Sequence, residues 1–293
     1  MTEASAEGFF LCFGPPKSGT TFLQRMLDLH PQVSCPSEHQ LDALSSGLDA
    51  LLDDYSDILV KIDQRTGGQG SRLPDRSARL AILRAVILEL SRAAARGKPV
   101  HGLSDNALFF SIGMVERLFG RPKMIAIVRN PVDLAVSTWR HNVRLAREEL
   151  EHAGDHLAII SNPAGLDGFV LQRAGWYNAA MQEFLGHVRG RPNITIVLYE
   201  RLVGDKRAEL QRLCDFLGVD RSDRLLDPII AGSSPEAMAS GSSHPEFYGV
   251  ASSAEGSLTL SDGVRQQVLR TCWPVLEQLG YRRSDLAAQS AAG

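Results

Sequence analysis

Several features that mark particular classes of protein are scarce in this 293-residue sequence. The four cysteines (Cys12, Cys35, Cys214 and Cys272) show no C-x-x-C spacing, so neither a zinc site nor a disulfide framework is supported. No apolar run approaches the roughly 20 residues that span a bilayer. The first residues are acidic and lack the basic start and apolar stretch of a signal peptide. We therefore expect free buried thiols, no membrane span and a reducing cytoplasm.

Positive charge is also not in excess. The formal net charge is −3, whereas a general nucleic-acid binder needs a basic surplus to neutralise phosphates, so we expect no nucleic-acid partner. A composition of 44% hydrophobic and 22% charged residues is that of an ordinary globular protein. The length favours a single domain over residues 1–293, with an ordered core over residues 8–284. Any cationic site must then be local.

Short apolar runs alternate with helical patterns along the chain. Strands are predicted over Phe9 to Phe13, Met124 to Val128 and Ile194 to Leu198. A long loop is predicted over Ala231 to Gly256, which is rich in Ser, Gly and Ala. Helices are predicted after Gly19, from Leu41 toward a Gly-rich loop at Gly70, over Ala78 to Arg96, from Pro131 onward, over Leu171 to Val188, over Lys206 to Leu217 and over Ser261 to Leu279.

Strands that alternate with helices predict an α/β protein, in which a mainly parallel central sheet is flanked by helices on both faces. Ligands of such sheets bind beyond the carboxyl ends of the strands. The first two predicted strands both end in polar, loop-forming residues. Those two strand ends are where a functional site is expected.

The first strand end carries the segment Gly14-Pro-Pro-Lys-Ser-Gly-Thr-Thr21, which leads directly into a helix. Backbone N–H groups at a helix start, together with the positive end of the helix dipole, favour an anion. Gly19 permits close approach of the backbone, and Lys17 adds a positive charge. An anion site is therefore predicted in this loop, although a plain capped turn would share part of the pattern.

The same loop differs from the nucleoside-triphosphate motif G-x-x-x-x-G-K-[ST] at its key position. Gly14, Gly19 and Thr21 match that motif, but Thr20 stands where the lysine belongs, and the cation lies three residues earlier at Lys17. Without that lysine the β- and γ-phosphates and Mg²⁺ would be held poorly. The difference disfavours an ATPase.

The second strand end carries Arg129-Asn130-Pro131, followed by a helix that contains Ser137. Arginine offers a planar fork of donors that suits phosphate oxygens, and a serine one to two turns into the helix adds a hydroxyl. Alone, this segment also fits an arginine–carboxylate pair. Its order and distance from the first motif favour the phosphate interpretation.

Together these motifs resemble the PAPS-dependent sulfotransferases, in particular the bacterial and carbohydrate-type branch (PAPS is 3′-phosphoadenosine-5′-phosphosulfate). The resemblance implies a P-loop-like three-layer fold, PAPS as co-substrate, the bisphosphate PAP as product and no metal. It implies that Lys17 contacts the oxygen that bridges phosphorus and sulfur, and that Arg129 and Ser137 hold the 3′-phosphate. It also assigns the 5′-phosphate to a set of loop residues: Lys17, Ser18, Gly19, Thr20 and Thr21.

Sulfuryl transfer to a hydroxyl needs a group that removes the hydroxyl proton. Glu38 is similar to the catalytic glutamate of the carbohydrate-directed and bacterial branch, and His101 is the reserve candidate, since the small-molecule branch uses a histidine near that point. One position departs from the family, because Ser104 stands where many relatives carry a lysine. We expect a sulfotransferase that acts on a hydroxyl or amine of a small-molecule or carbohydrate acceptor.

Two other functions stay open from the sequence. A P-loop kinase or nucleotidase would turn over ATP with Mg²⁺, and a non-catalytic module would bind a PAP-type nucleotide without transfer. Ser104 at the family's lysine position favours the second of these.

Overall fold

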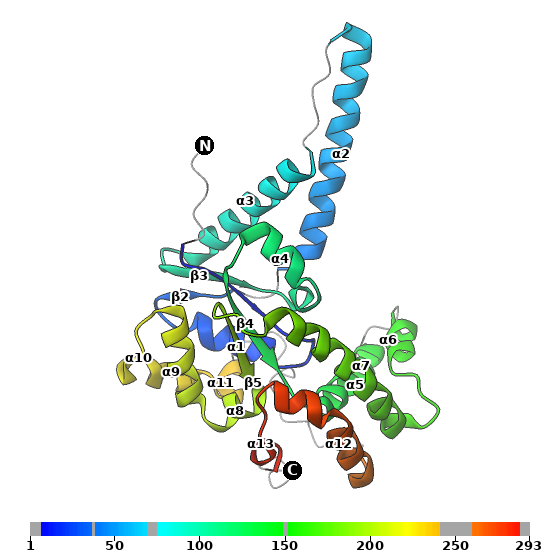
Figure 1. Cartoon of the computed structure of the whole chain (residues 1–293), viewed down its shortest axis with the longest axis vertical. Helices are drawn as coiled ribbons and strands as arrows, with labels where there is room; N and C mark the ends of the chain where they lie inside the picture. The colour runs from blue at the N-terminus through cyan, green and yellow to red at the C-terminus, as the bar shows by residue number, and fades with distance from the viewer. Residues whose placement is uncertain (1–6, 37–38, 69–74, 149–151, 241–259, 288–293) are drawn as a thin grey trace.

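The computed structural model describes residues 7–36, 39–68, 75–148, 152–240 and 260–287 (Figure 1). The strands are β1 (Phe9–Phe13), β2 (Val33–Ser34), β3 (Val100–Ser104), β4 (Lys123–Val128) and β5 (Ile194–Leu198). The helices are α1 (Thr20–Asp28), α2 (Leu41–Thr66), α3 (Arg76–Ala95), the 3-10 helix η1 (Asn106–Phe110), α4 (Ile112–Phe119), α5 (Pro131–Glu148), α6 (Ala153–Ile159), α7 (Gly165–Val188), α8 (Tyr199–Gly204), α9 (Lys206–Leu217), α10 (Asp223–Gly232), α11 (Pro235–Ser240), α12 (Asp262–Gln278) and α13 (Arg283–Ala287).

The five strands form one parallel sheet in the order β2-β3-β1-β4-β5. From β1 the chain first builds β2 and β3 on one side and then crosses to β4 and β5 on the other. The carboxyl end of β1 is therefore the switch point of the sheet, where ligands of open α/β sheets bind. The loop after β1 and the loop after β4 are neighbours there, because β1 and β4 are directly paired.

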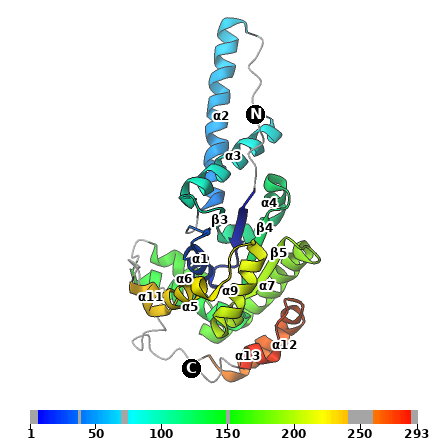
Figure 2. The same cartoon turned by 90° about the vertical axis from the view of Figure 1, so that its left-hand side faces the viewer.

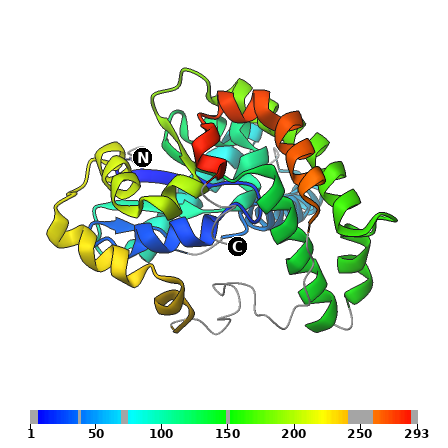
Figure 3. The same cartoon turned by 90° about the horizontal axis from the view of Figure 1, so that it is seen from below.

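Alternate residues of the central strands face two separate hydrophobic clusters. Phe9, Leu11 and Phe13 pack in the cluster with α3, α4, α5, α7 and α12, whereas Phe10 and Cys12 pack in the cluster with α1, α9 and α10. Helices thus cover both faces, which confirms the predicted three-layer α/β fold. Figure 3 shows α12 (orange) beside the green helices α5 and α7 on the first of these faces.

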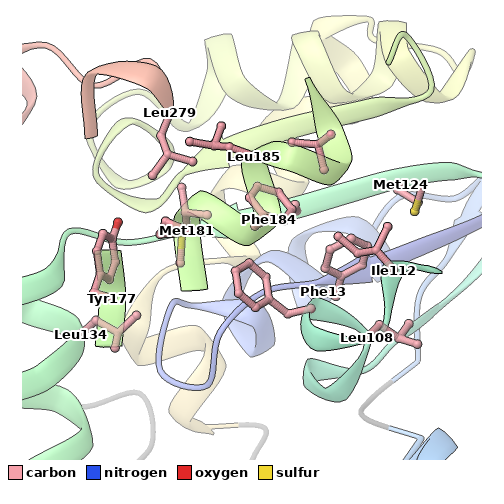
Figure 4. Close-up of a cluster of buried hydrophobic side chains, with 14 of the residues drawn as sticks. Phe13, Leu108, Ile112, Met124, Leu134, Tyr177, Met181, Phe184, Leu185 and Leu279 are labelled. Atoms are coloured by element: carbon pink, nitrogen blue, oxygen red, sulfur yellow. The ribbon is translucent and has the colours of Figure 1, made fainter. Parts of the chain in front are cut away.

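The cluster on the α7 face is the larger of the two in the described part of the chain. Figure 4 shows Phe13 of β1 among Met181 and Phe184 of α7. Phe184 also stacks on Phe109 of η1, with their ring centroids 4.9 Å apart. Aromatic packing of this kind ties α7 to the carboxyl edge of β1 and β3.

Strand β3 has no counterpart in the predictions. Strand β3 runs through Val100-His-Gly-Leu-Ser104, and its polar and glycine residues hide the apolar pattern of a buried strand. Gly102 is required there, because a Cβ atom would lie 2.5 Å from the ring of Phe10 on β1. Gly102 therefore makes the segment look unlike a buried strand in the sequence, and the same residue allows β3 to pack against Phe10.

The predicted loop over Ala231 to Gly256 is wrong in its first part. Helix α10 continues to Gly232, and α11 occupies Pro235–Ser240. Met238 of α11 is buried in the hydrophobic cluster that also contains residues of α1, α9 and α10. Residues 241–259 lie outside the described residues. The Ser- and Ala-rich composition did not reveal that one buried methionine anchors a short helix.

Two further expectations can be compared with the structure. All four cysteines are buried free thiols, as predicted. Among the helices that the structure describes, none is both long enough and apolar enough to cross a membrane.

Candidate nucleotide site

The loop between β1 and α1 has the backbone of a tight anion-binding turn. The Ser18 N–H donates to the Pro15 carbonyl at 3.0 Å, and Lys17 has a φ of 71°, in the left-handed region. Gly19, with a φ of 99°, caps α1 without a side-chain hydrogen bond. The first N–H groups of α1 are therefore left for a ligand, as the sequence predicts.

Gly19 is required for packing as well as for its φ. A Cβ atom at this position would collide with the ring of Tyr199, at the start of α8. At the other end of the loop, a Cβ atom at Gly14 would collide with the carbonyl of Ile127 on β4. The two glycines thus let the loop lie directly against the carboxyl ends of β4 and β5.

The second predicted group, Arg129, is in contact with this loop. Its Nη1 donates to the carbonyl oxygen of Lys17 at 3.3 Å. Its guanidinium also lies over the ring of Tyr199, with Cζ 4.4 Å from the ring centroid. The fold therefore brings together two cationic residues that are 112 positions apart in the sequence.

Two polar atoms at this point are buried without a hydrogen-bond partner. They are Oγ of Ser18 and Nε of Arg129, and neither has a partner among the described residues. Buried donors left unpaired are costly, so a ligand that accepts hydrogen bonds would stabilise them. Both are donors, as binding of phosphate oxygens requires. The residues present fit a phosphorylated ligand.

The remaining predicted nucleotide residues lie on the two helices that follow. Thr20 is buried and Thr21 is exposed at the start of α1. Ser137 is half-buried on α5, about two turns from the start of that helix. In the described part of the chain no hydrogen bond occupies the Ser137 hydroxyl, which leaves it available to a ligand.

A buried carboxylate, which the sequence did not single out, holds the backbone that carries Arg129. Glu200 on α8 accepts from the N–H of Asn130 at 2.9 Å and from the hydroxyl of Tyr281 at 2.7 Å. The hydroxyl of Tyr177 donates to the carbonyl of Arg129 at 3.0 Å. The bonds to Glu200 and from Tyr177 fix the two polar groups of the peptide bond that joins Arg129 to Asn130. In the sequence, the segment Tyr199-Glu200 is typical of residues that pack in the fold, and for that reason Glu200 was not selected as a site residue.

His101, the reserve candidate for the base, lies apart from the loop between β1 and α1. It pairs with Phe9 at the amino end of β1, four residues, or about 13 Å, from the carboxyl end of that strand at Phe13. The ring is buried, and Nδ1 lies 2.7 Å from the hydroxyl of Ser91 on α3. Burial lowers the pKa of His101 below its ordinary value. The residue is a packed histidine of β3, because the strand register places it there.

Glu38, the first candidate for the base, lies outside the described residues. The chain that follows it is anchored at the carboxyl edge of the sheet, since the N–H of Leu41 donates to Asp105 at 2.6 Å. Asp105 in turn donates its N–H to the carbonyl of Cys12 on β1. Ser104, which stands at the family's lysine position, is buried beside Cys12 in the sheet register.

Replacing Glu200 by glutamine is expected to change how stability depends on pH. Burial raises the pKa of Glu200, against the opposing effect of the bonds from Asn130 and Tyr281. A raised pKa favours the neutral carboxyl in the folded state, so this contribution is present below the unfolded pKa of about 4.3 and is lost as the pH rises through the folded pKa.

Glutamine resembles the neutral carboxyl, so the variant should gain stability relative to the wild type as the pH rises. Urea unfolding of both proteins between about pH 4 and pH 8 measures this difference. A difference in unfolding free energy that stays constant over that range would contradict the expectation.

The fold and this site define a class of protein: an α/β protein with a P-loop-like anion site and a second cationic strand end beside it. Among the described residues no group of three or more His, Cys, Asp or Glu side chains could hold a metal ion. The sulfotransferase family matches residues 10–223, well over half of the chain. The chain belongs to the sulfotransferase family, as the sequence motifs predict.

Two curated proteins to which the chain is similar are also sulfotransferases. The chain is 25% identical over 217 residues to protein-tyrosine sulfotransferase 2 of Gallus gallus, covering 73% of this chain and 52% of the relative. It is 30% identical over 118 residues to sulfotransferase 2B1 of Rattus norvegicus, covering 40% of this chain and 33% of the relative. The match thus spans about half of the first relative and a third of the second.

Solved structures confirm the fold. A sulfotransferase from Alicyclobacillus acidocaldarius matches with a TM-score of 0.50 and 20% identity, over 94% of this chain and 95% of that one. Mouse sulfotransferase SULT7A1 complexed with PAP matches with a TM-score of 0.53 and 17% identity, over 99% of this chain and 90% of that one. The predicted P-loop-like α/β architecture is therefore that of the family.

Proposed function

We propose that this protein transfers a sulfuryl group from PAPS to a hydroxyl or amine of a small-molecule or carbohydrate acceptor. The observation that carries the proposal is the contact between Arg129 and Lys17, which joins the two predicted phosphate sites at neighbouring strand ends. A nucleotide with phosphates on both its 3′- and 5′-oxygens would engage both sites at once. The PAP in the mouse relative is such a nucleotide.

The residues fall into two groups in this proposal. Lys17 and the segment Ser18 to Thr21 would hold the 5′-phosphosulfate, with the unpaired Ser18 hydroxyl as one donor. Arg129 and Ser137 would hold the 3′-phosphate, with the unpaired Nε of Arg129 as one donor. Bound PAPS supplies the activated sulfuryl group.

The chain's own residues would then assist an in-line transfer. Glu38 would accept the proton of the acceptor hydroxyl as the new O–S bond forms. Lys17 would stabilise the negative charge on the phosphate oxygen as its bond to sulfur breaks. The positive field comes from Lys17 and the start of α1, so no metal ion is assigned a role.

We also place the protein in the cytoplasm. The four buried free thiols support this location, since a reducing compartment preserves them.

Replacing Arg129 by alanine is expected to weaken PAP binding by at least about 100-fold. Two or more charge-assisted hydrogen bonds are lost, each contributing about 1.5–3 kcal/mol, and about 1.4 kcal/mol corresponds to a factor of ten. Calorimetric titration of the wild type and the variant with PAP and with ATP measures the effect. The wild type should prefer PAP strongly, and the variant should lose most of that preference.

The matched control is Arg140→Ala, which removes an exposed arginine from α5. It should bind PAP like the wild type. Equal affinities of the wild-type protein for PAP and ATP, or Mg²⁺-dependent turnover of ATP, would defeat the proposal in favour of a kinase or nucleotidase. Tight PAP binding without transfer to any acceptor in a broad panel would favour the non-catalytic module.

A further inference from the structure

Helix α2 carries an apolar repeat that is longer than the part of the helix that packs on its own domain. Apolar residues recur at alternating intervals of three and four, the spacing of a coiled-coil seam. The seam consists of Leu41, Leu44, Leu48, Leu51, Tyr55, Ile58 and Ile62.

Only the first half of this seam is covered. Leu41 is buried, and Leu44 and Leu48 pack against the main core. The remaining four seam residues are largely exposed to solvent. Their exposed fractions are 64% (Leu51), 54% (Tyr55), 52% (Ile58) and 50% (Ile62), and we call these four residues the distal seam. Two perpendicular views show this half of α2 extending away from the body of the domain (Figures 1 and 2).

The contacts that α2 makes with α3 lie on another side of the helix. Arg79 of α3 forms ion pairs with Asp49 and Asp53. These two positions lie off the seam, because Asp49 comes one residue after Leu48 and Asp53 comes two residues after Leu51. The pairing with α3 therefore holds α2 in place without covering the distal seam.

We propose that the distal seam binds the distal seam of a second copy of this chain, as an antiparallel two-stranded coiled coil. In this arrangement Leu51 packs against Ile62 of the second copy, and Tyr55 packs against Ile58 of the second copy. Each pairing occurs twice about the two-fold axis, so a single patch serves both chains. The two domain bodies then lie at opposite ends of the paired helices.

The charges beside the seam favour this orientation. Asp54 and Lys61 both precede a seam residue, and both are exposed. They lie seven residues, or about 10.5 Å, apart along the helix, too far to pair with each other. Among the described residues neither forms an ion pair. In the antiparallel register Asp54 meets Lys61 of the second copy, twice.

A parallel arrangement would lose this match. There Asp54 would face Leu59 of the second copy, and the like residues of the two chains would lie level with each other. The distal seam runs over the twelve residues from Leu51 to Ile62, a rise of about 16 Å, which is short for an obligate dimer. We therefore expect a reversible dimer with a dissociation constant on the order of 10 µM.

The seam can be tested without touching the nucleotide site. Leu51 lies ten residues, or about 15 Å, along α2 from Leu41. Ile58→Glu places a charge within the seam and should weaken dimerisation at least 100-fold. Val60→Glu is the matched control, because Val60 is 42% exposed on the same helix and lies off the seam. Sedimentation velocity from about 1 to about 200 µM measures association, and circular dichroism confirms that both variants fold.

Charge exchange tests the orientation. Asp54→Lys and Lys61→Asp each replace two attractive pairs with two repulsive ones, so each variant alone should dimerise at least tenfold more weakly. A mixture of the two variants should form a heterodimer close to wild-type affinity, since both of its pairs are again attractive. Recovery on mixing supports the antiparallel seam, and its absence overturns that orientation.

A wild-type protein that stays monomeric at about 200 µM would overturn the proposal and would assign the distal seam to a different partner. So would an Ile58→Glu variant that still dimerises, or a Val60→Glu variant as impaired as Ile58→Glu. None of these results depends on sulfuryl transfer, so the experiments test the dimer independently of the proposed function.

Discussion

Glu38→Gln is expected to lower the rate of sulfuryl transfer by about 100- to 10,000-fold, which is the usual contribution of a positioned general base. Glutamine keeps the size and hydrogen bonding of the side chain but cannot take a proton. PAP binding should change by less than about threefold, because the residue is proposed to act on the acceptor and not on the nucleotide. Transfer from radiolabelled PAPS to a panel of alcohols, phenols and amines measures the rate, and calorimetry measures the PAP affinity.

Two further variants make this test specific. Glu277→Gln changes an exposed glutamate of α12 in the same way and should leave transfer intact. His101→Gln should lower stability, since Nδ1 of His101 lies 2.7 Å from the Ser91 hydroxyl in the interior, but folded protein should still transfer. Loss of transfer in the histidine variant with no loss in Glu38→Gln would reverse the assignment of the base.

Lys17→Met should lower the rate of transfer by about 100- to 1,000-fold, the usual effect of removing one group that stabilises charge in a transition state. Methionine has a similar length but no charge, and it must adopt the same left-handed backbone at a φ of 71°. PAP should bind only about tenfold more weakly, because the other donors of the loop remain. The loss in rate should therefore exceed the loss in affinity, unlike the pattern for Arg129→Ala.

Lys17→Arg is the matched variant, since it retains the charge at the same backbone position. It should recover part of the rate that methionine loses, while the fork shape of arginine prevents full recovery. If Lys17→Met transferred as fast as the wild type, the positive charge would have no part in the reaction. The loop would then be a binding element alone.

The loop itself was predictable from the sequence because the residues that form it are adjacent along the chain. Gly14, Lys17 and Gly19 lie within a few residues of one another, next to a short apolar strand and the start of a helix. The two strand ends that carry Lys17 and Arg129 were also predictable as neighbours, since parallel strands present their carboxyl ends at one edge. The structure confirms that these two residues touch.

The position of His101 was not predictable in the same way. Its distance from the site depends on the register between β3 and β1, in which His101 pairs with Phe9 and Ser104 pairs with Cys12. Register is a property of two segments that are more than 80 residues apart, and no pattern within either segment contains it. The strand itself was hidden by Gly102, which the ring of Phe10 requires.

The sequence by itself determined the family, the alternation of strands and helices and the anion-binding loop, because each rests on residues that are adjacent or regularly spaced. Only the tertiary structure decided that Glu200 and Tyr281 hold the backbone of Arg129, that His101 lies at the amino end of its strand, and that half of the α2 seam is left uncovered. These features depend on burial and on contacts between distant segments. Such contacts exist only once the chain has folded, and a carboxylate or an apolar stripe looks the same in the sequence whether or not a partner covers it.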